Sequence, residues 1–405
     1  MSRVLIAWEL GGAYGHLSRL LPVALALRAR GHEPVFAVRD LMEVESLLTP
    51  HGIAAVQAPL WLGRLHNLPP AIHYAELLMR FGYLHPTALT GICRAWRHLL
   101  SLLQPALVVM DHAPTALLAT RGLRLGRLNL GDGFCIPPPG RPMPSFVWWQ
   151  PGQPARVQDS EAQVVAGANG VLQALGAPQL GALSELAECD AQMLCTFAEL
   201  DHYPGRDGAE FVGPIFSLGR GVDMDWPGGD GPRVFVYLHA GYPQIESVLA
   251  ALQRTPARVL AHVAGASQQT MLRFGSARLR FSPAPLNMAA MCAQCDLAVG
   301  HGGAGTVAAM LLAGKPQLLL PMHMEQAMAA RRVAGLQAAA AVPPESAGQV
   351  QELLAALLAE PALAQGARAF AARHAGYDQA TAIDRVADCC EALIAQAIQA
   401  SQATR

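Results

Sequence analysis

A glycine-rich segment, residues 300–306, holds the residue types best suited to bind a diphosphate. An apolar run at residues 297–299 is expected to form a buried strand, and residues 306–313 are expected to form a helix that ends at Gly314. Glycines let a ligand approach the backbone closely, and the free N–H groups at a helix N-terminus favour negative charge. The His301 side chain adds a donor for a phosphate oxygen. A plain strand-to-helix turn, with glycines for tight packing only, is the alternative.

A second set of candidate residues follows two predicted strands near the N-terminus. His16 begins a predicted helix after the strand at residues 4–8, and Asp111 ends the predicted strand at residues 105–111. Both side chains are expected at the carboxyl edge of one sheet, where α/β folds bind ligands. A carboxylate that accepts the second ring N–H of a histidine fixes its tautomer and makes it a general base. A capping or solvent-exposed histidine is the alternative, and His112 is expected on the other face of the strand.

The elements around these residues predict an α/β fold. Strand 4–8, helix 17–30 and strand 33–38 form a βαβ unit, which opens a doubly wound parallel sheet. The intervening glycines do not match the Gly-x-Gly-x-x-Gly dinucleotide fingerprint, because Gly11 and Gly12 are adjacent. A dinucleotide cofactor is therefore not predicted.

A stretch rich in Gly, Pro and Asp at residues 212–232 marks a predicted domain boundary. We expect an N-terminal domain at residues 1–212, a second domain at residues 213–379, and a C-terminal helix at residues 380–405 that packs back on the first domain. The boundary stretch contains Asp223-Met224-Asp225, but no third ligand stands nearby, so no metal site is predicted.

Composition excludes several function classes. The 405 residues are 52% hydrophobic and 15% charged, which is typical of a globular chain with large cores. A net charge of −1 provides no basic field for nucleic acid. Lys315 is the only lysine, and Pro316 follows it, so the chain has no Walker-type phosphate loop. Binding of a nucleotide must therefore use helix ends, His and Arg.

Nothing in the sequence predicts export or membrane insertion. The N-terminus enters a strand directly without a signal peptide, and no uncharged apolar segment is long enough to span a bilayer. The eight cysteines are scattered, and Cys292 and Cys295 are read as packing residues in a predicted helix. A reduced cytoplasmic protein is expected, with no transmembrane segment and with peripheral membrane contact left open.

Two segments of the first domain are candidates for an acceptor site. Residues 61–103 carry aromatic side chains and one methionine that either line an apolar pocket or belong to the ordinary core. They are Trp61, His66, Tyr74, Met79, Phe81, Tyr83 and Trp96. Residues 131–160 are rich in Pro and Gly with Phe146, Trp148 and Trp149 among them, and are a candidate lid. A hydrophobic small molecule or a lipid is the expected acceptor.

The motifs resemble those of a known family. The segment from His301 to Thr306, followed by Gly314-Lys315-Pro316, Pro321 and Glu325-Gln326, resembles the donor-binding signature of the family 1 glycosyltransferases, which have the GT-B fold. Gly11-Gly12-x-x-Gly15-His16 resembles the first βα unit of that family, and Val212-Gly213-Pro214 resembles its interdomain hinge. The resemblance is to the bacterial natural-product and macrolide type, and it covers most of the chain in order.

This resemblance implies two Rossmann-like domains facing a central cleft and an inverting transfer of a hexose from a UDP- or dTDP-sugar to an acceptor hydroxyl. His16 is implied as the base and Asp111 as its orienting partner. The residues implied to bind the nucleotide sugar are Gly12, His301, Gly302, Gly303, Gly305, Thr306, Glu325 and Gln326. The helix dipole and His301 stabilise the leaving diphosphate, so no metal and no cofactor other than the nucleotide sugar are implied.

The sequence also departs from the family pattern. Many family members that use UDP-sugars have Glu eight residues after the histidine that corresponds to His301, and this Glu bonds the ribose hydroxyls. This chain has Ala309 at that position, which favours dTDP, whose deoxyribose lacks the 2′-hydroxyl. Phe281 is the nearest candidate for an aromatic platform under the nucleobase. Two other functions fit parts of the pattern: a GT-B epimerase of UDP-sugars and a non-catalytic nucleotide-sugar-binding protein. The chain has both the His16–Asp111 pair and the glycine-rich segment at residues 300–306, and this combination favours the transferase.

Overall fold

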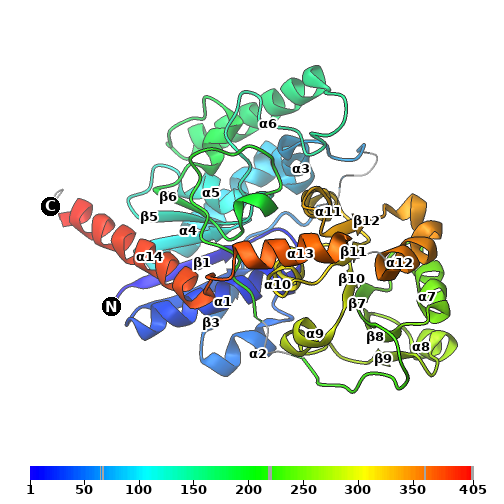
Figure 1. Ribbon diagram of the computed structural model, residues 1–405. Helices are drawn as coiled ribbons and strands as arrows, with labels where there is room; N and C mark the ends of the chain where they lie inside the picture. The colour runs from blue at the N-terminus through cyan, green and yellow to red at the C-terminus, as the bar shows by residue number, and fades with distance from the viewer. Residues whose placement is uncertain (64, 66–67, 218–220, 360–361, 403–405) are drawn as a thin grey trace. The chain divides into compact units, whose positions relative to one another are not determined.

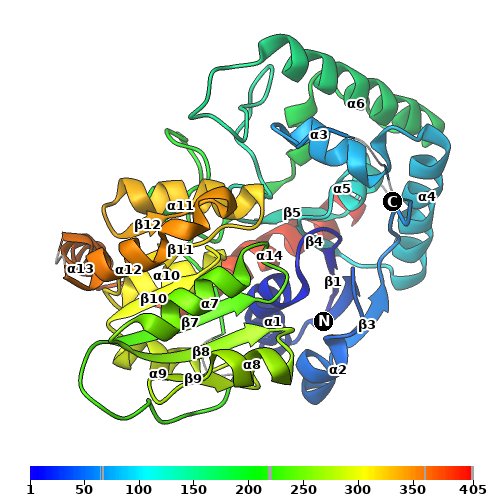
Figure 2. The same ribbon diagram turned by 90° about the vertical axis from the view of Figure 1, so that its right-hand side faces the viewer.

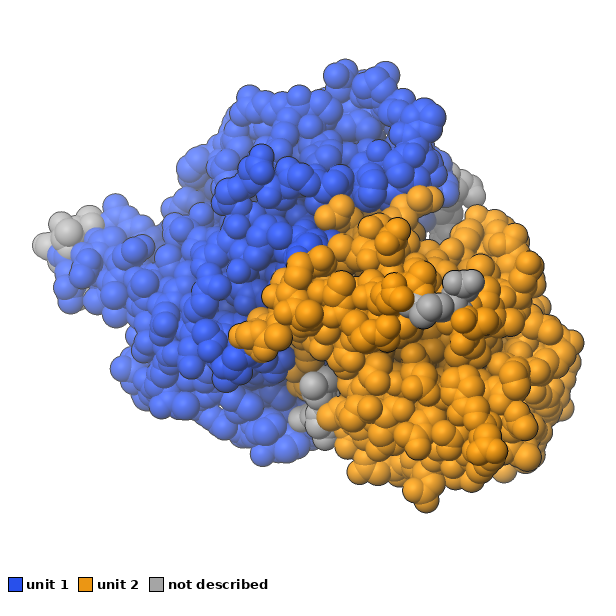
Figure 3. All heavy atoms as spheres, viewed as in Figure 1, with its two compact units in different colours: residues 1–215, 378–405 blue, residues 216–377 orange. Residues whose placement is uncertain are grey.

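A computed structural model describes the chain except for residues 64, 66–67, 218–220, 360–361 and 403–405. Two compact units are present, coloured separately in Figure 3. Unit 1 comprises residues 1–215 and 378–405, and unit 2 comprises residues 216–377. Each unit contains a six-stranded sheet in which every pair of neighbouring strands is parallel.

The sheet of unit 1 has the strand order β3-β2-β1-β4-β5-β6 (Figure 1). Its strands are β1 (Arg3–Trp8), β2 (Glu33–Val38), β3 (Ala54–Gln57), β4 (Leu107–Asp111), β5 (Gly126–Gly131) and β6 (Ala191–Leu194). Its α-helices are α1 (Ala13–Ala29), α2 (Val44–Leu47), α3 (Tyr74–Leu78), α4 (Pro86–Leu103), α5 (Pro114–Thr120), α6 (Pro154–Ala174) and α14 (Gln379–Gln402). The central strands β1 and β4 are nearly continuous apolar runs, as expected for a parallel sheet covered by helices on both faces.

The last helix, α14, belongs to unit 1 although it follows all of unit 2 in sequence. It packs against α1, β4 and β5. Arg30, the residue that ends α1, forms ion pairs with Asp384, Asp388 and Glu391 of α14 at 2.8, 2.5 and 3.0 Å. These acidic side chains are 43–70% exposed, so the pairs fix the position of α14 more than they stabilise the fold.

The sheet of unit 2 has the order β12-β11-β10-β7-β8-β9 (Figure 2). Its strands are β7 (Arg233–His239), β8 (Arg258–Ala264), β9 (Leu279–Ser282), β10 (Leu297–Gly300), β11 (Gln317–Leu319) and β12 (Ala339–Ala341). Its α-helices are α7 (Ile245–Arg254), α8 (Gln268–Phe274), α9 (Met288–Gln294), α10 (Ala304–Leu312), α11 (Met324–Gly335), α12 (Val350–Ala359) and α13 (Ala362–Arg373). Its apolar core includes the inward residues of β7, β8 and β10 and the buried face of α7.

Each sheet reverses its strand order at one place, and such switch points are where doubly wound folds bind ligands. In unit 1 the reversal lies between β1 and β4, and in unit 2 between β7 and β10. Asp111 ends β4, and His16 follows β1 in the first turn of α1. His301 follows β10. The fold therefore brings the main candidate residues of each unit to its own switch point.

Four of the seven side chains named in the 61–103 segment belong to the core of unit 1. Tyr74, Met79, Tyr83 and Trp96 are at most 8% exposed, which supports the core interpretation; His66 lies outside the described residues. No helix among the described residues is long and apolar enough to cross a bilayer.

Candidate active site

His16 and Asp111 meet at the switch point of unit 1. Nδ1 of His16 lies 3.0 Å from Oδ2 of Asp111, an ion-pair contact at hydrogen-bond distance in which the ring N–H is not well aligned. The Asp111 side chain is fully buried and that of His16 is 13% exposed. Burial alone would raise the pKa of Asp111, but the neighbouring charges of His16 and Arg19 hold that pKa below its ordinary value. The carboxylate is thus ionised at neutral pH and faces the ring.

Two residues beside the first strand orient the His16 ring. Trp8 ends β1 and stacks on His16 with ring centroids 5.4 Å apart at 19°. Gly11 has φ +97°, and a Cβ at this position would lie 2.2 Å from Nε2 of His16. A side chain at residue 11 would therefore collide with the nitrogen that does not face Asp111. Glycine leaves that space unfilled.

Arg19 and Asp132 extend the pair into a buried charged cluster that we did not predict. Arg19 lies one turn after His16 in α1, and its Nη1 lies 3.3 Å from both oxygens of Asp111. Its Nη2 donates to Oδ2 of Asp132 at 2.9 Å. Asp132 follows β5 directly, so it projects from the same sheet edge as Asp111. The i, i+3 spacing from His16 and the position after a third strand were the available signals in the sequence.

The prediction that His112 lies on the other face of the strand from Asp111 is wrong, because both residues lie near the His16 ring. The residue has φ +47°, and its ring centroid lies 6.0 Å from that of His16. Side chains alternate between faces only while the strand continues, and β4 ends at Asp111. Burial lowers the pKa of His112 to about 4, so this ring is neutral at pH 7.

His301 of unit 2 is held by both ring nitrogens. Nδ1 lies 2.6 Å from the backbone oxygen of Leu320, and the backbone N–H of His239 donates to Nε2 at 2.8 Å. This pattern assigns the ring proton to Nδ1, since Nε2 accepts. Burial lowers the pKa of His301. In this conformation the neutral ring has no donor left for a phosphate, so the predicted contact requires Nε2 to release the His239 N–H.

The N-terminus of α10 retains the features expected of an anion site. Gly303 is the N-cap residue in extended conformation, no side chain caps the helix, and no acidic residue lies in its first turn. The first backbone hydrogen bond of α10 is donated by the Val307 N–H to the Gly303 oxygen. The N–H groups of residues 304–306 therefore have no acceptor within the helix. Gly302 has φ +94°, and a Cβ there would lie 3.2 Å from the Gln326 oxygen. A side chain at residue 302 would therefore be both strained and crowded, which favours glycine there.

The other residues predicted to bind the nucleotide sugar lie in or near the first turns of helices, where most of them are half-buried or exposed. Thr306 and Gly305 lie half-buried in the first turn of α10, and Glu325 is half-buried in the first turn of α11. Gln326 accepts the Met322 N–H through Oε1 at 2.8 Å. Gly12 is the exposed N-cap residue of α1 in unit 1.

Two further expectations can be compared with the structure. Phe281, the candidate nucleobase platform, packs against the hydrophobic core of unit 2. The centre of the Pro-rich loop is pinned: Phe146 is 1% exposed and its N–H donates to the Ile72 oxygen at 2.8 Å, while the Met143 N–H donates to Glu161 at 2.7 Å. This anchoring argues against the predicted lid.

Cys292 and Cys295 carry neutral thiols, because burial raises their pKa values to about 11 and about 12. Among the described residues, no group of three His, Cys, Asp or Glu side chains is arranged to hold a metal ion.

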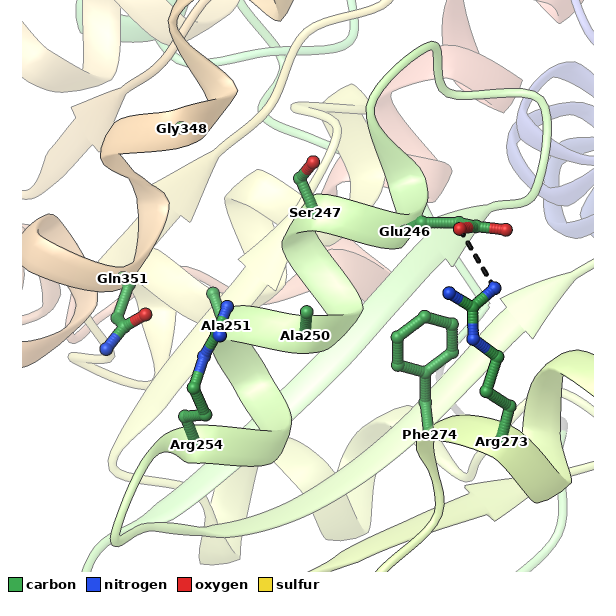
Figure 4. A pocket seen from close by; sticks show the side chains of 9 residues that line it. All are labelled: Glu246, Ser247, Ala250, Ala251, Arg254, Arg273, Phe274, Gly348 and Gln351. Carbon is green, nitrogen blue, oxygen red and sulfur yellow. Dashed lines mark hydrogen bonds and ion pairs between the residues drawn. The ribbon is translucent and has the colours of Figure 1, made fainter.

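A shallow cavity of about 410 Å³ lies elsewhere in unit 2 (Figure 4). Its lining comes from α7, α8 and the segment around Gly348, and Arg273 spans part of it to reach Glu246 at 3.0 Å. None of the residues predicted to bind the donor lines it.

Comparisons with known proteins agree with the motifs. Residues 246–393 match the family model described as the erythromycin biosynthesis protein CIII-like C-terminal domain. The TDP-daunosamine transferase DnrS of Streptomyces peucetius is 34% identical over 132 residues, which are 31% of this chain and 30% of that protein. The sequence match thus spans less than a third of that relative.

Solved structures match over nearly the whole chain. The glycosyltransferase of kitacinnamycin superposes with a TM-score of 0.71 at 18% identity, covering 97% of this chain and 99% of the other. The spinosyn rhamnosyltransferase SpnG, complexed with thymidine diphosphate, gives a TM-score of 0.68 at 16% identity, covering 96% and 100%.

These likenesses confirm the predicted fold class, GT-B with two Rossmann-like units. The sequence matches agree with the resemblance over part of the chain: residues 246–393 are similar to the erythromycin-CIII-like C-terminal domain, and 132 residues are similar to a TDP-daunosamine transferase.

Proposed function

We propose that this chain is an inverting glycosyltransferase that moves a hexose from a thymidine diphosphate sugar to a hydroxyl group of a natural-product aglycone. The observation that carries the proposal is the 3.0 Å contact between His16 Nδ1 and the buried Asp111 carboxylate at the switch point of unit 1. An imidazole oriented in this way by an ionised carboxylate is the arrangement required of a general base. A protein that only bound nucleotide sugars would have no use for it.

In the proposed reaction, Nε2 of His16 takes the proton of the acceptor hydroxyl. The acceptor oxygen forms a bond to the anomeric carbon while the bond from that carbon to the β-phosphate oxygen breaks. The electron pair of the broken bond leaves with the nucleoside diphosphate. Attack on the face opposite the leaving group inverts the anomeric centre. The imidazolium produced at His16 lies against the Asp111 carboxylate, which stabilises it.

The N-terminus of α10 is proposed to bind the diphosphate. Its uncapped N–H groups and its dipole favour the negative charge that develops on the leaving group, so the step needs no metal ion. The similar proteins favour thymidine diphosphate as the nucleotide of the donor, since DnrS is a TDP-daunosamine transferase and SpnG was solved with thymidine diphosphate. Ala309 is consistent with this nucleotide, because the 2′-deoxyribose of dTDP has no 2′-hydroxyl for a glutamate at residue 309 to bind.

The acceptor is proposed to be a hydrophobic hydroxylated small molecule. Two apolar rings lie close by: Trp8 stacks on His16, and Phe134 contacts the neighbouring His112 edge-on at 5.9 Å. Such surroundings favour an apolar acceptor that presents one hydroxyl to Nε2.

The function is tested by incubating the purified protein with dTDP-hexoses and a panel of polyketide aglycones. We expect mass spectrometry to detect aglycone plus one hexose, and NMR coupling constants to show the anomeric configuration opposite to that of the donor. Retention of configuration would exclude the single displacement. Tight binding of dTDP, measured by calorimetry, without transfer to any acceptor or hydrolysis of donor would favour a binding protein instead.

A further inference from the structure

Arg19 is a buried cation whose contacts explain the orientation of Asp111. Only 7% of Arg19 is exposed, and Asp111 and Asp132 are 0% and 3% exposed. Buried charges are retained only when they are paired and hydrogen-bonded, because desolvation is costly. The three side chains come from α1, from the end of β4 and from the residue after β5.

The two carboxylates differ in how they are held. Oδ1 of Asp132 accepts the backbone N–H groups of Phe134 and Cys135 at 3.1 and 3.2 Å, so the local backbone fixes Asp132. The Asp111 carboxylate has only Arg19 and His16 as polar partners among the described residues. Asp132 therefore anchors Arg19, and Arg19 in turn anchors Asp111.

The charges in this cluster do not cancel. Arg19 supplies one positive charge against two carboxylates, which leaves a net charge of −1 facing His16. Two of the other titratable neighbours, His112 and Cys195, carry no charge at neutral pH. Burial lowers the pKa of His112 to about 4 and raises the pKa of the Cys195 thiol to about 12. His202 faces Asp132 from the other side, with Nδ1 4.0 Å from Oδ1, and Cys135 adjoins Arg19.

We propose that Arg19 is a positioning residue for the His16–Asp111 pair: its guanidinium, anchored on Asp132, holds the Asp111 carboxylate against His16 Nδ1, and the single negative charge left on the cluster sets how firmly His16 holds its proton. The inference rests on the proposed function, in which His16 is the base. It adds a second carboxylate, Asp132, that tunes the base without touching it.

Two substitutions in the cluster have opposite effects under this proposal. Arg19→Met leaves both carboxylates uncompensated, so protonated His16 is favoured and its titration moves to higher pH. Asp132→Asn keeps an oxygen for the two backbone N–H groups but removes one negative charge, so the titration moves to lower pH. We expect shifts of about 0.5 pH units or more in each direction. Arg19→Lys keeps the charge but not the planar fork, and is expected to shift the titration least.

The experiment follows the His16 ring by NMR in protein with isotope-labelled histidine, with His16→Gln identifying the signal, and records kcat/KM against pH in parallel. The inflection on the acid side of the rate profile is expected to move with the ring titration. Arg19→Met is expected to lower kcat about 10- to 100-fold with donor KM unchanged, because an interaction made in the transition state is lost. Shifts in the same direction for both variants, or no shift in either, would overturn the proposal.

The ring titration does not depend on turnover, so the inference and the proposed function can fail separately. If Arg19→Met does not fold, Arg19→Lys and Asp132→Asn decide the matter. The proposal then requires a shift to lower pH for Asp132→Asn and little shift for Arg19→Lys. If instead the ring shifts as expected while no transfer is detected with any acceptor, the cluster tunes His16 but the catalytic role of His16 is wrong.

Discussion

Trp8 and Asp111 are partners in the parallel register between β1 and β4, and each contacts His16. Trp8 stacks on one face of the imidazole, while Asp111 lies at its Nδ1 edge. The two strands that flank the switch point thus each supply one of the groups that fix the ring. The base is oriented by the sheet itself, since the ends of β1 and β4 are buried.

Replacing Asp111 with Asn is expected to reduce kcat about 10²-fold or more, because a neutral amide neither fixes the tautomer nor stabilises the imidazolium. Dissociation constants for dTDP should remain unchanged, since Asp111 lies in unit 1 and the proposed diphosphate site lies in unit 2. Calorimetry and initial rates on the same preparation test both statements. A variant as active as the wild type would remove the orienting role.

Gly11→Ala is expected to abolish transfer, because the added Cβ would lie 2.2 Å from Nε2 of His16 and because φ +97° is strained for alanine. Gly15→Ala is a matched control in the same segment, since Gly15 has ordinary φ and no atom within 4 Å of an added Cβ. Thermal unfolding of both variants separates the effect on folding from the effect on the base. Full activity in Gly11→Ala would show that Nε2 does not need the space that the glycine leaves.

The lowered pKa of His112 predicts a loss of stability in acid. The folded state keeps this ring neutral down to about pH 4, whereas the unfolded chain protonates it below about pH 6.5. Stability is therefore unaffected above about pH 6.5 and falls as the pH decreases towards 4, by about 2 kcal/mol at pH 5.

His112→Asn removes this titration, and asparagine tolerates the positive φ of the position. Urea unfolding of wild type and variant at pH 7 and pH 5 measures the difference. The wild type should lose about 2 kcal/mol more than His112→Asn over this interval. Equal losses in the two proteins would mean that His112 does not titrate as proposed.

Binding of dTDP is expected to take up a proton through His301. Its Nδ1 proton is committed to the Leu320 oxygen, so donation to a phosphate from Nε2 requires the imidazolium form. The calorimetric enthalpy should then depend on the ionisation enthalpy of the buffer, and the affinity should rise as the pH falls towards the lowered pKa of His301. His301→Ala should bind dTDP about 10- to 100-fold more weakly and without this dependence. Buffer-independent binding by the wild type would mean that backbone N–H groups alone hold the diphosphate.

Much of this arrangement could be predicted from local patterns. The apolar runs of β1, β4 and β10, with the glycines that follow β1 and β10, identified the strands, the glycine-rich turn before α10 and the positions of His16, Asp111 and His301. These signals are short-range, because one strand, one turn and the following helix carry them. The parallel order of the sheet then follows from the βαβ connections.

The parts that were missed depend on relationships across the sheet. Arg19 reaches Asp132 over 113 residues of sequence, and no local pattern marks the two as partners. His112 was assigned to the wrong face because the left-handed turn after Asp111 is invisible in the residue type. Tertiary packing, not propensity, determined both.

The central claim is that His16 is the base. The most direct test measures the rate at which the His16→Ala variant transfers the sugar from a dTDP-hexose to a confirmed acceptor. The account predicts that kcat falls about 10²-fold or more while dTDP binds within about twofold of the wild-type affinity. Turnover within about threefold of the wild type, with the same dTDP affinity, would contradict the account, because the proton would then leave the acceptor without the His16–Asp111 pair.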